Sequence, residues 1–396
     1  MPEVRVLFLG IGNPAPSFIK NRILQLDKTG QLKAVVLVRS ESFNEFPLEN
    51  GLVLPQLPVR FSLQHTIFPL IWFSLRFPVS TIRLWLSLSM YSFRARVKSF
   101  IKYQSLVRTK RINVVHFQWI VSPDEIKWAR KLFKAPVIIS ARGSQLTIYP
   151  VTESGYENEV RESLQTADHI YAVSRSMARA CKEFGADPAK IFVSYNGIDA
   201  DQVKYIGKQE RQGTLRLVST GTLMWRKGYF WQLILIRKLT DAGLDVKLEI
   251  IGDGPDRQGL DYTIKRLGLQ DRVTLAGRMK HDAIIKYLQA SDIYISTSSA
   301  EGLSNAVLEA VASGLPVVAF DCEGMNELIE NGYNGFILPF GNLETMCENI
   351  RLLNADRQLM LSMGQNGSKL ASDRFDYKIH VQKMADFYMS ISSENE

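Results

Sequence analysis

Short apolar runs alternate with longer segments of mixed polarity along almost the whole chain. Val4–Leu9 and Ala34–Val38 are apolar runs, and Ser17–Lys28 between them has the spacing of a helix with one buried side. A strand, a helix and a second strand in this order form a unit in which the two strands lie parallel. The beginning of the chain therefore predicts a parallel α/β sheet.

The same alternation continues through the first half of the chain and then begins again. Further strands are expected at 113–117, 136–140, 169–173 and 191–193, with helices at 157–167 and 175–184. After a polar linker over 200–213, strands are expected at 215–219, 247–251, 273–275, 293–296, 317–320 and 335–338, with helices at 229–241, 256–267 and 281–290. A chain of 396 residues is too long for one core. We therefore predict two α/β domains, residues 1–205 and 206–375, and a last helical segment, 376–396.

Most of the expected strands end in a polar loop that contains glycine. Ligands of open α/β sheets bind outside the carboxyl ends of the strands, so these loops are where a site is expected. The first loop, Gly10-Ile11-Gly12, lacks the third glycine of the dinucleotide fingerprint. Gly12 therefore serves either a tight strand-to-helix turn or the lining of a ligand site. His116, near the end of strand 113–117, is likewise either structural or functional.

One stretch, Thr297–Val318, combines the end of a strand, a glycine loop and the start of a helix. Ser304 is the expected N-cap of that helix. The backbone N–H groups at a helix start carry a partial positive charge, which suits a phosphate. The candidate residues for this contact are Gly302, Leu303, Ser304 and Asn305.

Four charged residues add to this stretch. Arg226 and Lys227 lie on another loop of the same expected sheet edge and can place full positive charges on a diphosphate. Glu301 and Glu309 remain for hydroxyl groups. The sequence shows no Asp-x-Asp loop and no paired histidines, so we expect no metal site. The combination suits a nucleotide sugar, in which a diphosphate lies between two polyols.

The net charge of +8 is concentrated in one region. Residues 50–123 contain ten Arg and Lys but no Asp or Glu, and within segment 58–111 these alternate with aromatic and aliphatic residues. Arg76, Arg83 and Arg94 are spaced to lie on one side of a helix. Such a helix either docks on an anionic membrane surface, binds an acidic ligand, or is an ordinary core helix with a solvated basic face. No nucleic-acid-binding motif is present.

Other features concern the cellular compartment. The uncharged run Phe61–Leu75 is shorter than the roughly 20 residues that a membrane-spanning helix needs. Three scattered cysteines form neither a disulfide framework nor a zinc motif, which fits a reducing compartment. The N-terminus lacks the charged and apolar regions of a signal peptide.

These motifs together resemble the retaining nucleotide-sugar glycosyltransferases of family 4, which have the GT-B fold, over nearly the whole chain. The most specific motif is a pair of glutamates with seven residues between them, Glu301-GLSNAVL-Glu309, followed by Ala-Val-Ala-Ser-Gly-Leu-Pro-Val-Val. Supporting motifs are Gly221-TLMW-Arg226-Lys227-Gly228, Gly252-Asp-Gly-Pro255, Tyr195-Asn-Gly-Ile-Asp199 and Asn331-Gly-Tyr-Asn-Gly335. Pro16-Ser17-Phe18-Ile19 with Asn21 resembles the start of colanic-acid-type members.

The resemblance implies two Rossmann-like, doubly wound parallel-sheet domains that face a central cleft, with the donor on the C-terminal domain. Glu309 would bind the ribose, Glu301 the transferred sugar, and Arg226 and Lys227 the diphosphate. Donor-lining positions would also include Gly254 and the loop beside the base, Arg278-Met279.

On the acceptor side, the resemblance places Arg142 and His116, and His116 is also a candidate catalytic group. The last helix, from about Tyr377, would cross back to the first domain. Many relatives have His-Gly where this chain has Arg142-Gly143, and Asp where it has Gln145, which implies a changed acceptor pocket. Thr222 also stands where Arg is common.

The predicted function is retaining, metal-independent transfer of a hexose from a nucleotide sugar in bacterial polysaccharide biosynthesis. The donor is expected to be a UDP- or GDP-sugar, and the acceptor a saccharide or a lipid-linked glycan. The protein is expected in the cytoplasm, peripherally bound to the inner face of the cytoplasmic membrane. The alternatives are a sugar phosphorylase or nucleotide-sugar epimerase with the same fold, and a non-catalytic partner in polysaccharide assembly.

Overall fold

The computed structural model describes residues 3–393 except 13, 57–67, 110, 200–202, 204, 206 and 208–211. The chain forms two compact units. The first consists of Met1–Val173, Met177–Ser194 and Ile379–Glu396, and the second of Ser174–Ser176 and Tyr195–Lys378. Residues 58–67 and Lys110 of the basic segment, the expected boundary residue 206 and most of the linker over 200–213 lie outside the described residues.

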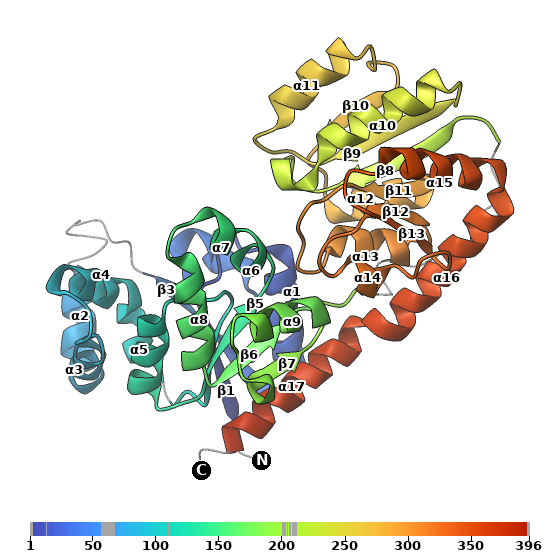
Figure 1. Ribbon diagram of the computed structural model, residues 1–396. Helices are drawn as coiled ribbons and strands as arrows, with labels where there is room; N and C mark the ends of the chain where they lie inside the picture. Colours follow the sequence, from blue (N-terminus) through green and yellow to red (C-terminus); the bar gives the residue numbers. More distant parts are fainter. Residues whose placement is uncertain are drawn as a thin grey trace. The chain divides into compact units, whose positions relative to one another are not determined.

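The first unit is built on a seven-stranded parallel sheet in the order β3-β2-β1-β4-β5-β6-β7 (Figure 1). Its inner strands are almost fully buried, which explains why they are continuous apolar runs. The strands are β1 (Val4–Leu9), β2 (Leu32–Arg39), β3 (Leu52–Gln56), β4 (Val114–Phe117), β5 (Val137–Ala141), β6 (His169–Ala172) and β7 (Ile191–Val193).

The second unit has a six-stranded parallel sheet in the order β10-β9-β8-β11-β12-β13. Both sheets therefore share one winding, in which the order reverses between the first and the fourth strand of each unit. Reversal points of this kind are where open α/β sheets bind ligands. The strands are β8 (Leu215–Thr220), β9 (Val246–Ile251), β10 (Val273–Gly277), β11 (Ile293–Ser296), β12 (Val317–Phe320) and β13 (Gly335–Leu338).

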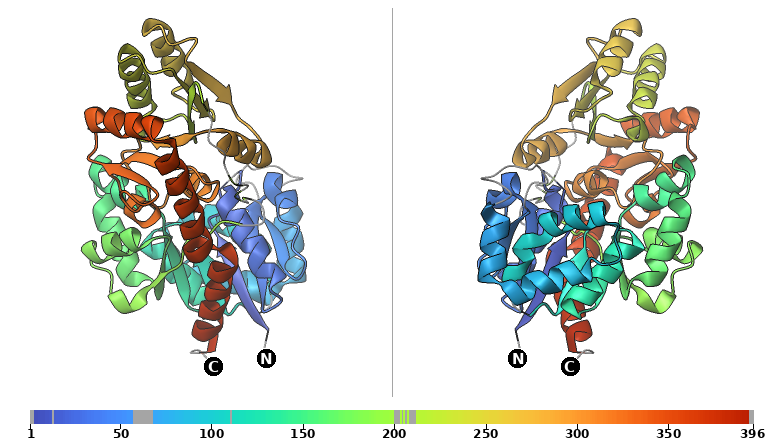
Figure 2. Two further views of the ribbon diagram at one scale, coloured as in Figure 1. Left: turned by 90° about the vertical axis from the view of Figure 1, so that its right-hand side faces the viewer. Right: turned by 90° about the vertical axis from the view of Figure 1, so that its left-hand side faces the viewer.

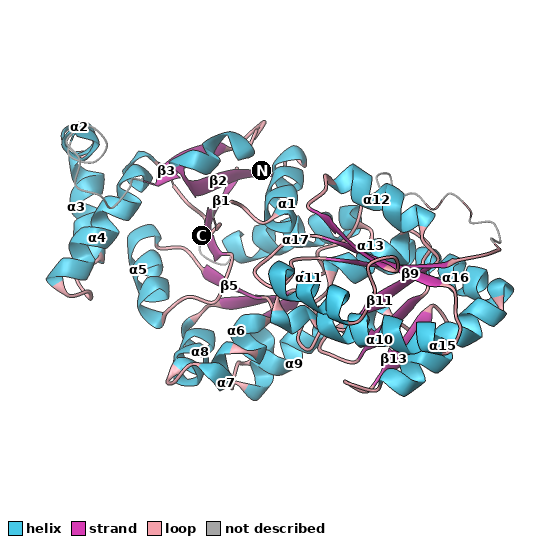
Figure 3. Cartoon of the chain, turned by 90° about the horizontal axis from the view of Figure 1, so that it is seen from above, coloured by secondary structure: helices cyan, strands magenta, loops and turns pink. Residues whose placement is uncertain are grey.

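Helices cover both faces of each sheet, as Figure 3 shows. In the first unit they are α1 (Ser17–Lys28), α2 (Phe68–Arg76), α3 (Pro78–Ser87), α4 (Phe93–Tyr103), α5 (Pro123–Phe133), α6 (Ser144–Thr147), α7 (Tyr149–Thr152), α8 (Tyr156–Thr166) and α9 (Arg175–Glu183), with 3-10 turns η1 (Ser40–Glu45), η3 (Gln104–Arg108) and η4 (Pro188–Lys190). In the second they are α10 (Tyr229–Asp241), α11 (Arg257–Arg266), α12 (His281–Ala290), α13 (Asn305–Ala312), α14 (Met325–Leu328), α15 (Leu343–Ala355) and α16 (Arg357–Phe375), with η5 (Trp225–Lys227).

The last helix, α17 (Tyr377–Ser393), packs within the first unit from Ile379 on. Phe387 stacks on Phe192 of β7 with ring centroids 4.1 Å apart, and Tyr388 reaches His116 of β4. In Figure 2 the helix runs alongside the strands of that sheet. The C-terminal segment therefore completes the core that the first residues of the chain begin.

The basic segment differs from the prediction of one helix face. Its described part forms three helices, because Pro78 starts α3 after Phe77 and a turn at 88–92 separates α4. Arg76, Arg83 and Arg94 lie one on each helix, so the prediction that they share one side of a helix was wrong. α3 packs on α5, outside the sheet (Figures 1 and 3).

Candidate functional site

The loops after β8 and β11 meet at the reversal point of the second sheet. Gly228 has a φ of 65°, and a Cβ there would lie 2.1 Å from the Thr297 carbonyl oxygen, so only glycine fits. Thr297 Oγ1 donates to the Gly228 carbonyl at 2.9 Å, and Ser299 N–H donates to the Arg226 carbonyl at 2.8 Å. These backbone contacts fix the side chains that follow on both loops.

Three charged side chains meet between these loops. Lys227 Nζ lies 2.5 Å from Glu301 Oε1, and Arg226 Nη1 lies 3.7 Å from Glu301 Oε2. Ser298 Oγ donates to Glu301 Oε1 at 2.9 Å. The Glu301 side chain is only 8% exposed, so its charge depends on these partners. The structure thus brings three of the predicted donor-site residues together.

The start of α13 follows directly after Glu301. Ser304 is the N-cap and accepts from Val307 N–H at 3.5 Å, which confirms the predicted cap. The preceding loop is held by Ser174 Oγ, which donates to the Gly302 carbonyl at 2.7 Å. Asn305 Oδ1 accepts from Asn196 Nδ2 at 3.0 Å, whereas Leu303 is buried.

A small polar cavity lies beside Lys227, and sequence reasoning missed most of its lining. It is lined by Ser219, Thr220, Lys227, Tyr229, Gln232, Tyr294, Ser296, Thr297, Ser298 and Ser304. Tyr229 Oη and Gln232 Oε1 are buried there without a hydrogen-bond partner among the described residues. Burial, and then the nearby Tyr294 and Glu301, raise the pKa of Tyr229 well above its usual value. The available signal was a tyrosine and a glutamine in the otherwise apolar stretch Tyr229–Ile236.

Glu309 and the Arg278 loop make separate contacts. Glu309 Oε1 lies 3.2 Å from Nε2 of His281, which raises the pKa of that histidine. Arg278 is 82% exposed, with Nε 3.9 Å from Asp253 Oδ2, and Met279 follows it on the loop between β10 and α12. His281 was not among the predicted site residues, although it follows the predicted base loop.

Gly254 has a packing reason to be glycine. A Cβ at this position would lie 2.3 Å from the carbonyl oxygen of Leu223 and 2.7 Å from its nitrogen. The loops after β8 and β9 therefore approach each other too closely for a side chain. A donor-lining role for Gly254 stays a prediction beside this structural one.

In the first unit, His116 lies deep in the core. Its Nδ1 pairs with Tyr388 Oη at 2.6 Å and its Nε2 with Ser140 Oγ at 2.8 Å, and the side chain is 1% exposed. Burial, followed by the positive charges of Arg142 and Arg22, lowers its pKa well below the usual value. His116 is therefore neutral, and a ligand could reach a ring nitrogen only if one of these bonds broke. Its catalytic and acceptor-side roles stay predictions.

Three further predicted positions lie in the first unit, two on loops and Gln145 in α6. Arg142 Nε donates to the Gln118 carbonyl at 2.8 Å and its Nη2 to Gln118 Oε1 at 3.1 Å. Gln145 holds the loop after β4 by two hydrogen bonds with the backbone of Ile120, at 2.8 and 2.9 Å. Gly10 has a φ of 74°, whereas Gly12 does not have positive φ, so the tight turn requires glycine at 10 rather than at 12.

Within the described part of the chain, no three His, Cys, Asp or Glu side chains gather as metal ligands. No helix that the structure describes is long and apolar enough to cross a membrane.

Two family sequence profiles match adjacent parts of the chain. The profile described as "Glycosyl transferases group 1" matches residues 203–370, and "Glycosyltransferase Family 4" matches residues 66–202. Together they span residues 66–370, which is most of the chain and includes parts of both units.

Individual proteins are similar at lower identity. Alpha-D-kanosaminyltransferase of Streptomyces kanamyceticus is 29% identical over 48% of this chain and 52% of its own length, so the chain matches about half of that relative. The Escherichia coli UDP-Gal:alpha-D-GlcNAc-diphosphoundecaprenol alpha-1,3-galactosyltransferase is 23% identical over 74% of this chain and 80% of its own. HepE of Anabaena, crystallised with UDP-glucose, is 19% identical and superimposes with a TM-score of 0.71 over 98% of this chain and all of its own. At that identity the likeness shows the fold.

Proposed function

The chain belongs to the group 1 and family 4 glycosyltransferases, and we propose that it transfers a hexose, with retention, from a UDP- or GDP-sugar to a saccharide or lipid-linked acceptor. We further propose that the reaction needs no metal and serves polysaccharide biosynthesis. The observation that carries this proposal is the cluster of Arg226, Lys227 and Glu301 at the reversal point of the second sheet, beside the start of α13.

In the proposed complex, the second unit binds the donor. Lys227 and Arg226 stabilise the negative charge that develops on the leaving diphosphate, together with the N–H groups at the start of α13. Glu301, already held by Lys227 and Ser298, accepts hydrogen bonds from the transferred sugar. Glu309 binds the ribose, and Arg278-Met279 lies beside the base. The acceptor hydroxyl attacks from the face that the diphosphate leaves, without a covalent enzyme intermediate.

The similar proteins support the choice of donor and acceptor class. HepE was crystallised with UDP-glucose, and the name of the Escherichia coli relative specifies a UDP-sugar donor and a diphosphoundecaprenol-linked acceptor. A UDP-hexose is therefore the donor to test first. Colanic acid and lipopolysaccharide glycosyltransferases among the relatives support a role in glycan assembly.

The donor proposal is tested by titrating the protein with UDP-, GDP-, ADP- and CMP-sugars while following its unfolding temperature. A true donor stabilises the folded state, by about 2.7 kcal/mol at a hundredfold excess over its dissociation constant. Lys227→Ala should abolish most of this gain, whereas Lys238→Ala, an exposed lysine of the same unit, should retain it. No stabilisation by any nucleotide sugar would favour the non-catalytic alternative. Phosphate-dependent sugar phosphate release, or an epimerised donor, would favour the other enzymes.

We also propose that α2–α4 dock the protein on an anionic membrane, on the inner face of the cytoplasmic membrane. Leu75 is 78% exposed and Phe93 76% exposed, although both are large and apolar. The exposed large apolar side chains of α2–α4 and the turn after α3, which we together call the apolar patch, are Ile71, Trp72, Leu75, Val79, Ile82, Leu86, Met90 and Phe93. Apolar side chains flanked by Arg and Lys, with no acid nearby in sequence, are typical of an interfacial element.

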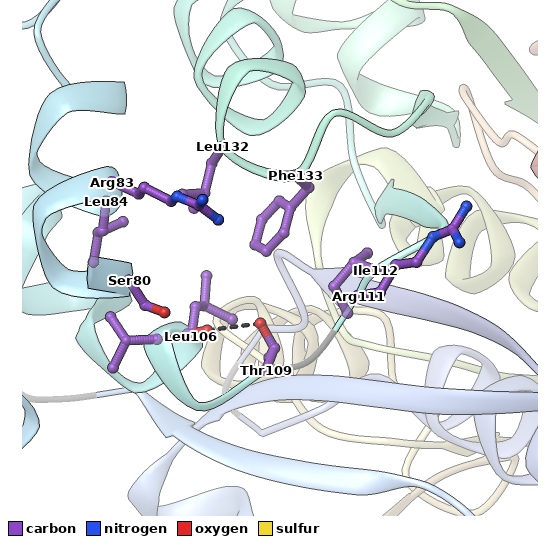
Figure 4. Close-up of a pocket in the computed structure, with 10 residues that line it drawn as sticks. Ser80, Arg83, Leu84, Leu106, Thr109, Arg111, Ile112, Leu132 and Phe133 are labelled. Carbon is purple, nitrogen blue, oxygen red and sulfur yellow. Dashed lines mark hydrogen bonds between the residues drawn. The ribbon is translucent and has the colours of Figure 1, made fainter. Parts of the chain in front are cut away.

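A cavity lies beside the apolar patch, between α3, η3 and α5 (Figure 4). Arg83 extends from α3 into this space toward Phe133, and Leu84 and Leu106 form part of its apolar wall. A cation above apolar side chains suits the phosphate and upper chain of an anionic lipid.

The docking proposal is tested by sedimentation with vesicles of phosphatidylglycerol or of phosphatidylcholine. Leu75→Ser/Ile82→Ser should reduce binding to both, and Arg76→Glu/Arg83→Glu should reduce binding to phosphatidylglycerol only. Val151→Ser, an equally exposed apolar position of the same unit, is the control. Unchanged binding in both double variants would contradict the assignment of this face.

A further inference from the structure

Arg142 carries a positive charge that no described residue neutralises. Two of its hydrogen bonds go to the neutral Gln118, and its Nη1 is buried without a partner among the residues that the structure describes. No carboxylate of any described residue lies within 4.0 Å of its guanidinium. Burial, and then repulsion by Arg22, lower the pKa of Arg142 well below its usual range. Arg142 as a whole is half-buried, but its Nη1 is fully buried, and a charge in this position is costly unless a partner with negative charge completes its environment.

A second arginine stands close by. Arg22, 7% exposed, donates through Nη1 to Tyr171 Oη, and its Cζ lies 4.8 Å from the centre of the Tyr171 ring. Arg142 Cζ lies 5.4 Å from the same centre and 5.1 Å from that of Phe18. Aromatic faces stabilise such cations only in part, so the two guanidinium groups make this region of the first unit strongly positive.

Gln118 supplies another buried donor. Its side chain is 1% exposed, and its Oε1 is occupied by Arg142, whereas its Nε2 has no hydrogen-bond partner in the described part of the chain. Buried N–H donors are rarely left unpaired in proteins. The two unpaired groups, Nε2 of Gln118 and Nη1 of Arg142, belong to residues that are themselves hydrogen-bonded to each other. Both are donors, and the described residues supply neither of them with a hydrogen-bond acceptor.

This cluster, which we call the Arg142 cluster (Arg22, Gln118, Arg142 and Tyr171), lies where a ligand is expected. Gln118 follows β4 and Arg142 follows β5, at the carboxyl edge of the sheet. The loop after β1 reaches the same place, because a Cβ on Gly10 would lie 3.8 Å from Gln118 N and 3.7 Å from Trp119 Cδ1. β1 and β4 are neighbouring strands, and the strand order reverses between them.

We propose that the Arg142 cluster binds an oxyanion carried by the acceptor, which is a phosphate, a diphosphate or a sugar carboxylate. The planar guanidinium matches two oxygens of such a group, and Gln118 Nε2 donates to a third or shares one of the two. Assigning the anion to the acceptor rests on the proposed glycosyl transfer, whereas binding of the anion itself does not. Because His116 uses both ring nitrogens internally, Arg142 rather than His116 recognises the acceptor.

The test measures binding of three anions and their neutral counterparts to the full chain. The pairs are geranyl diphosphate with geraniol, glucuronate with glucose, and inorganic pyrophosphate with buffer alone. Titrations are run by calorimetry with saturating UDP present, so that the phosphate-binding groups of the second unit are occupied. If geranyl diphosphate binds most tightly, the acceptor is lipid-linked. If glucuronate binds most tightly, the acceptor is an acidic glycan, and if pyrophosphate does, the site recognises a bare phosphate group. At least one anion should bind better than its neutral counterpart.

The variants separate this site from a merely structural role. Arg142→Gln should weaken binding of the preferred anion at least tenfold, about the loss of one charge-assisted hydrogen bond. Arg142→Lys keeps the charge but not the planar guanidinium with its two parallel donors. Its affinity for the preferred anion should lie between those of the wild type and Arg142→Gln. Arg161→Gln, an exposed arginine of the same unit, should bind as the wild type does. Since Arg142 has no carboxylate partner among the described residues, Arg142→Gln should also keep an unfolding temperature at or above that of the wild type.

Equal affinity of wild type and Arg142→Gln for all three anions would overturn the proposal. So would a large fall in unfolding temperature in Arg142→Gln, because it would show that Arg142 already has a stabilising role. UDP affinity, measured in separate titrations of the same proteins without added UDP, reports on the donor proposal separately. Loss of UDP binding with intact anion binding would therefore reject the donor site and leave the Arg142 cluster standing.

Discussion

Removing Lys227 alone should destabilise the second unit more than removing both Lys227 and Glu301. The Glu301 carboxylate is 8% exposed and Lys227 is 15% exposed, so their contact is mostly shielded from water. In Lys227→Met the carboxylate keeps only Ser298 Oγ at 2.9 Å and the more distant Arg226. In Lys227→Met/Glu301→Gln the buried charge disappears together with its partner.

The size of the effect follows from the burial. Taking one partner from a buried ion pair costs 3–5 kcal/mol, and because Arg226 remains 3.7 Å from Glu301 we expect about 3 kcal/mol. For a unit of this size that corresponds to a fall in unfolding temperature of about 6–12 °C. The double variant should lie within about 1 kcal/mol of wild type, since replacing both members of a buried pair is often close to neutral. Glu301→Gln alone should cost less than Lys227→Met, because the flexible lysine can turn its ammonium group toward water.

Urea unfolding followed by circular dichroism, with calorimetry of the same four proteins, measures this cycle. Lys238→Met, which removes an exposed pair with Glu344, is the control and should leave the unfolding midpoint unchanged, because solvent screens exposed ion pairs. If the double variant were as unstable as Lys227→Met, the cost would not come from a stranded carboxylate. Burial of an unpaired Glu301 charge would then not explain the instability of Lys227→Met.

Three other changes test single contacts. Gly254→Ala should destabilise the second unit by at least about 2 kcal/mol, seen in its unfolding temperature, because the new Cβ meets the backbone of the neighbouring loop. Tyr388→Phe should cost about 1–3 kcal/mol in urea unfolding, because it leaves Nδ1 of the buried His116 unpaired, yet should leave turnover per folded molecule unchanged. His281→Gln should lower stability by less than about 1 kcal/mol at pH 6 and not at pH 9. The pKa of His281 is raised by Glu309, so the pair stabilises the folded state below pH 6.5 and is lost as pH rises through the raised value.

Each of these has a matched control. Gly259→Ala is the control for Gly254, because this glycine of α11 also has no positive φ and a Cβ there would approach only the end of the Phe230 side chain, at 3.3 Å. Tyr149→Phe removes an exposed hydroxyl of the first unit and should be neutral. If a control variant lost as much stability as the variant it is paired with, the contact under test would not be the cause of the loss. A stability difference of His281→Gln that persists at pH 9 would likewise show that the pair with Glu309 is not its cause.

Most of the fold could be predicted from the sequence because buried parallel strands are continuous apolar runs. The bounds of β11, β12 and β13 were predicted to the residue, and so were those of α1 and α10. β3 was missed because it is a partly exposed edge strand with Pro55 inside it, which weakens the apolar signal. α5 was missed although Ser122 caps it and Asp124 and Glu125 occupy its first turn.

The prediction of a single basic helix side in the region of α2–α4 failed for a different reason. Its apolar residues occur at too many positions to define one buried side, and the spacing of the arginines suggested a single helix. Pro78 instead begins a new helix, and the apolar side chains of Leu75 and Ile82 remain exposed. Helix prediction from periodicity assumes that apolar residues are buried and polar residues are exposed. An exposed apolar surface, which is typical of an interaction site, does not fit this assumption.

The candidate donor site was predictable where its residues are close in sequence or in recognisable loops. Glu301, Arg226 and Lys227 were found because glycine loops mark the ends of strands. The residues around these side chains, Tyr229 and Ser298, were not predicted. They come close to the site only because β8 and β11 are neighbouring strands, which the sequence does not show directly. The same holds for His116, whose partner Tyr388 is 272 residues away in sequence.

Comparison of the two reversal points shows what strand order does and does not determine. Both sheets place the loops after their first and fourth strands side by side, so topology alone locates a site in each unit. In the second unit the cations Arg226 and Lys227 meet an internal acid, Glu301, which neutralises one of their two positive charges before any ligand arrives. In the first unit the described residues offer Arg142 a neutral glutamine and aromatic rings but no carboxylate. A ligand of the second unit must therefore compete with or rearrange a protein carboxylate, whereas a ligand of the first unit supplies the missing negative charge itself. This difference is the reason to look for the anion on the acceptor as well as on the donor.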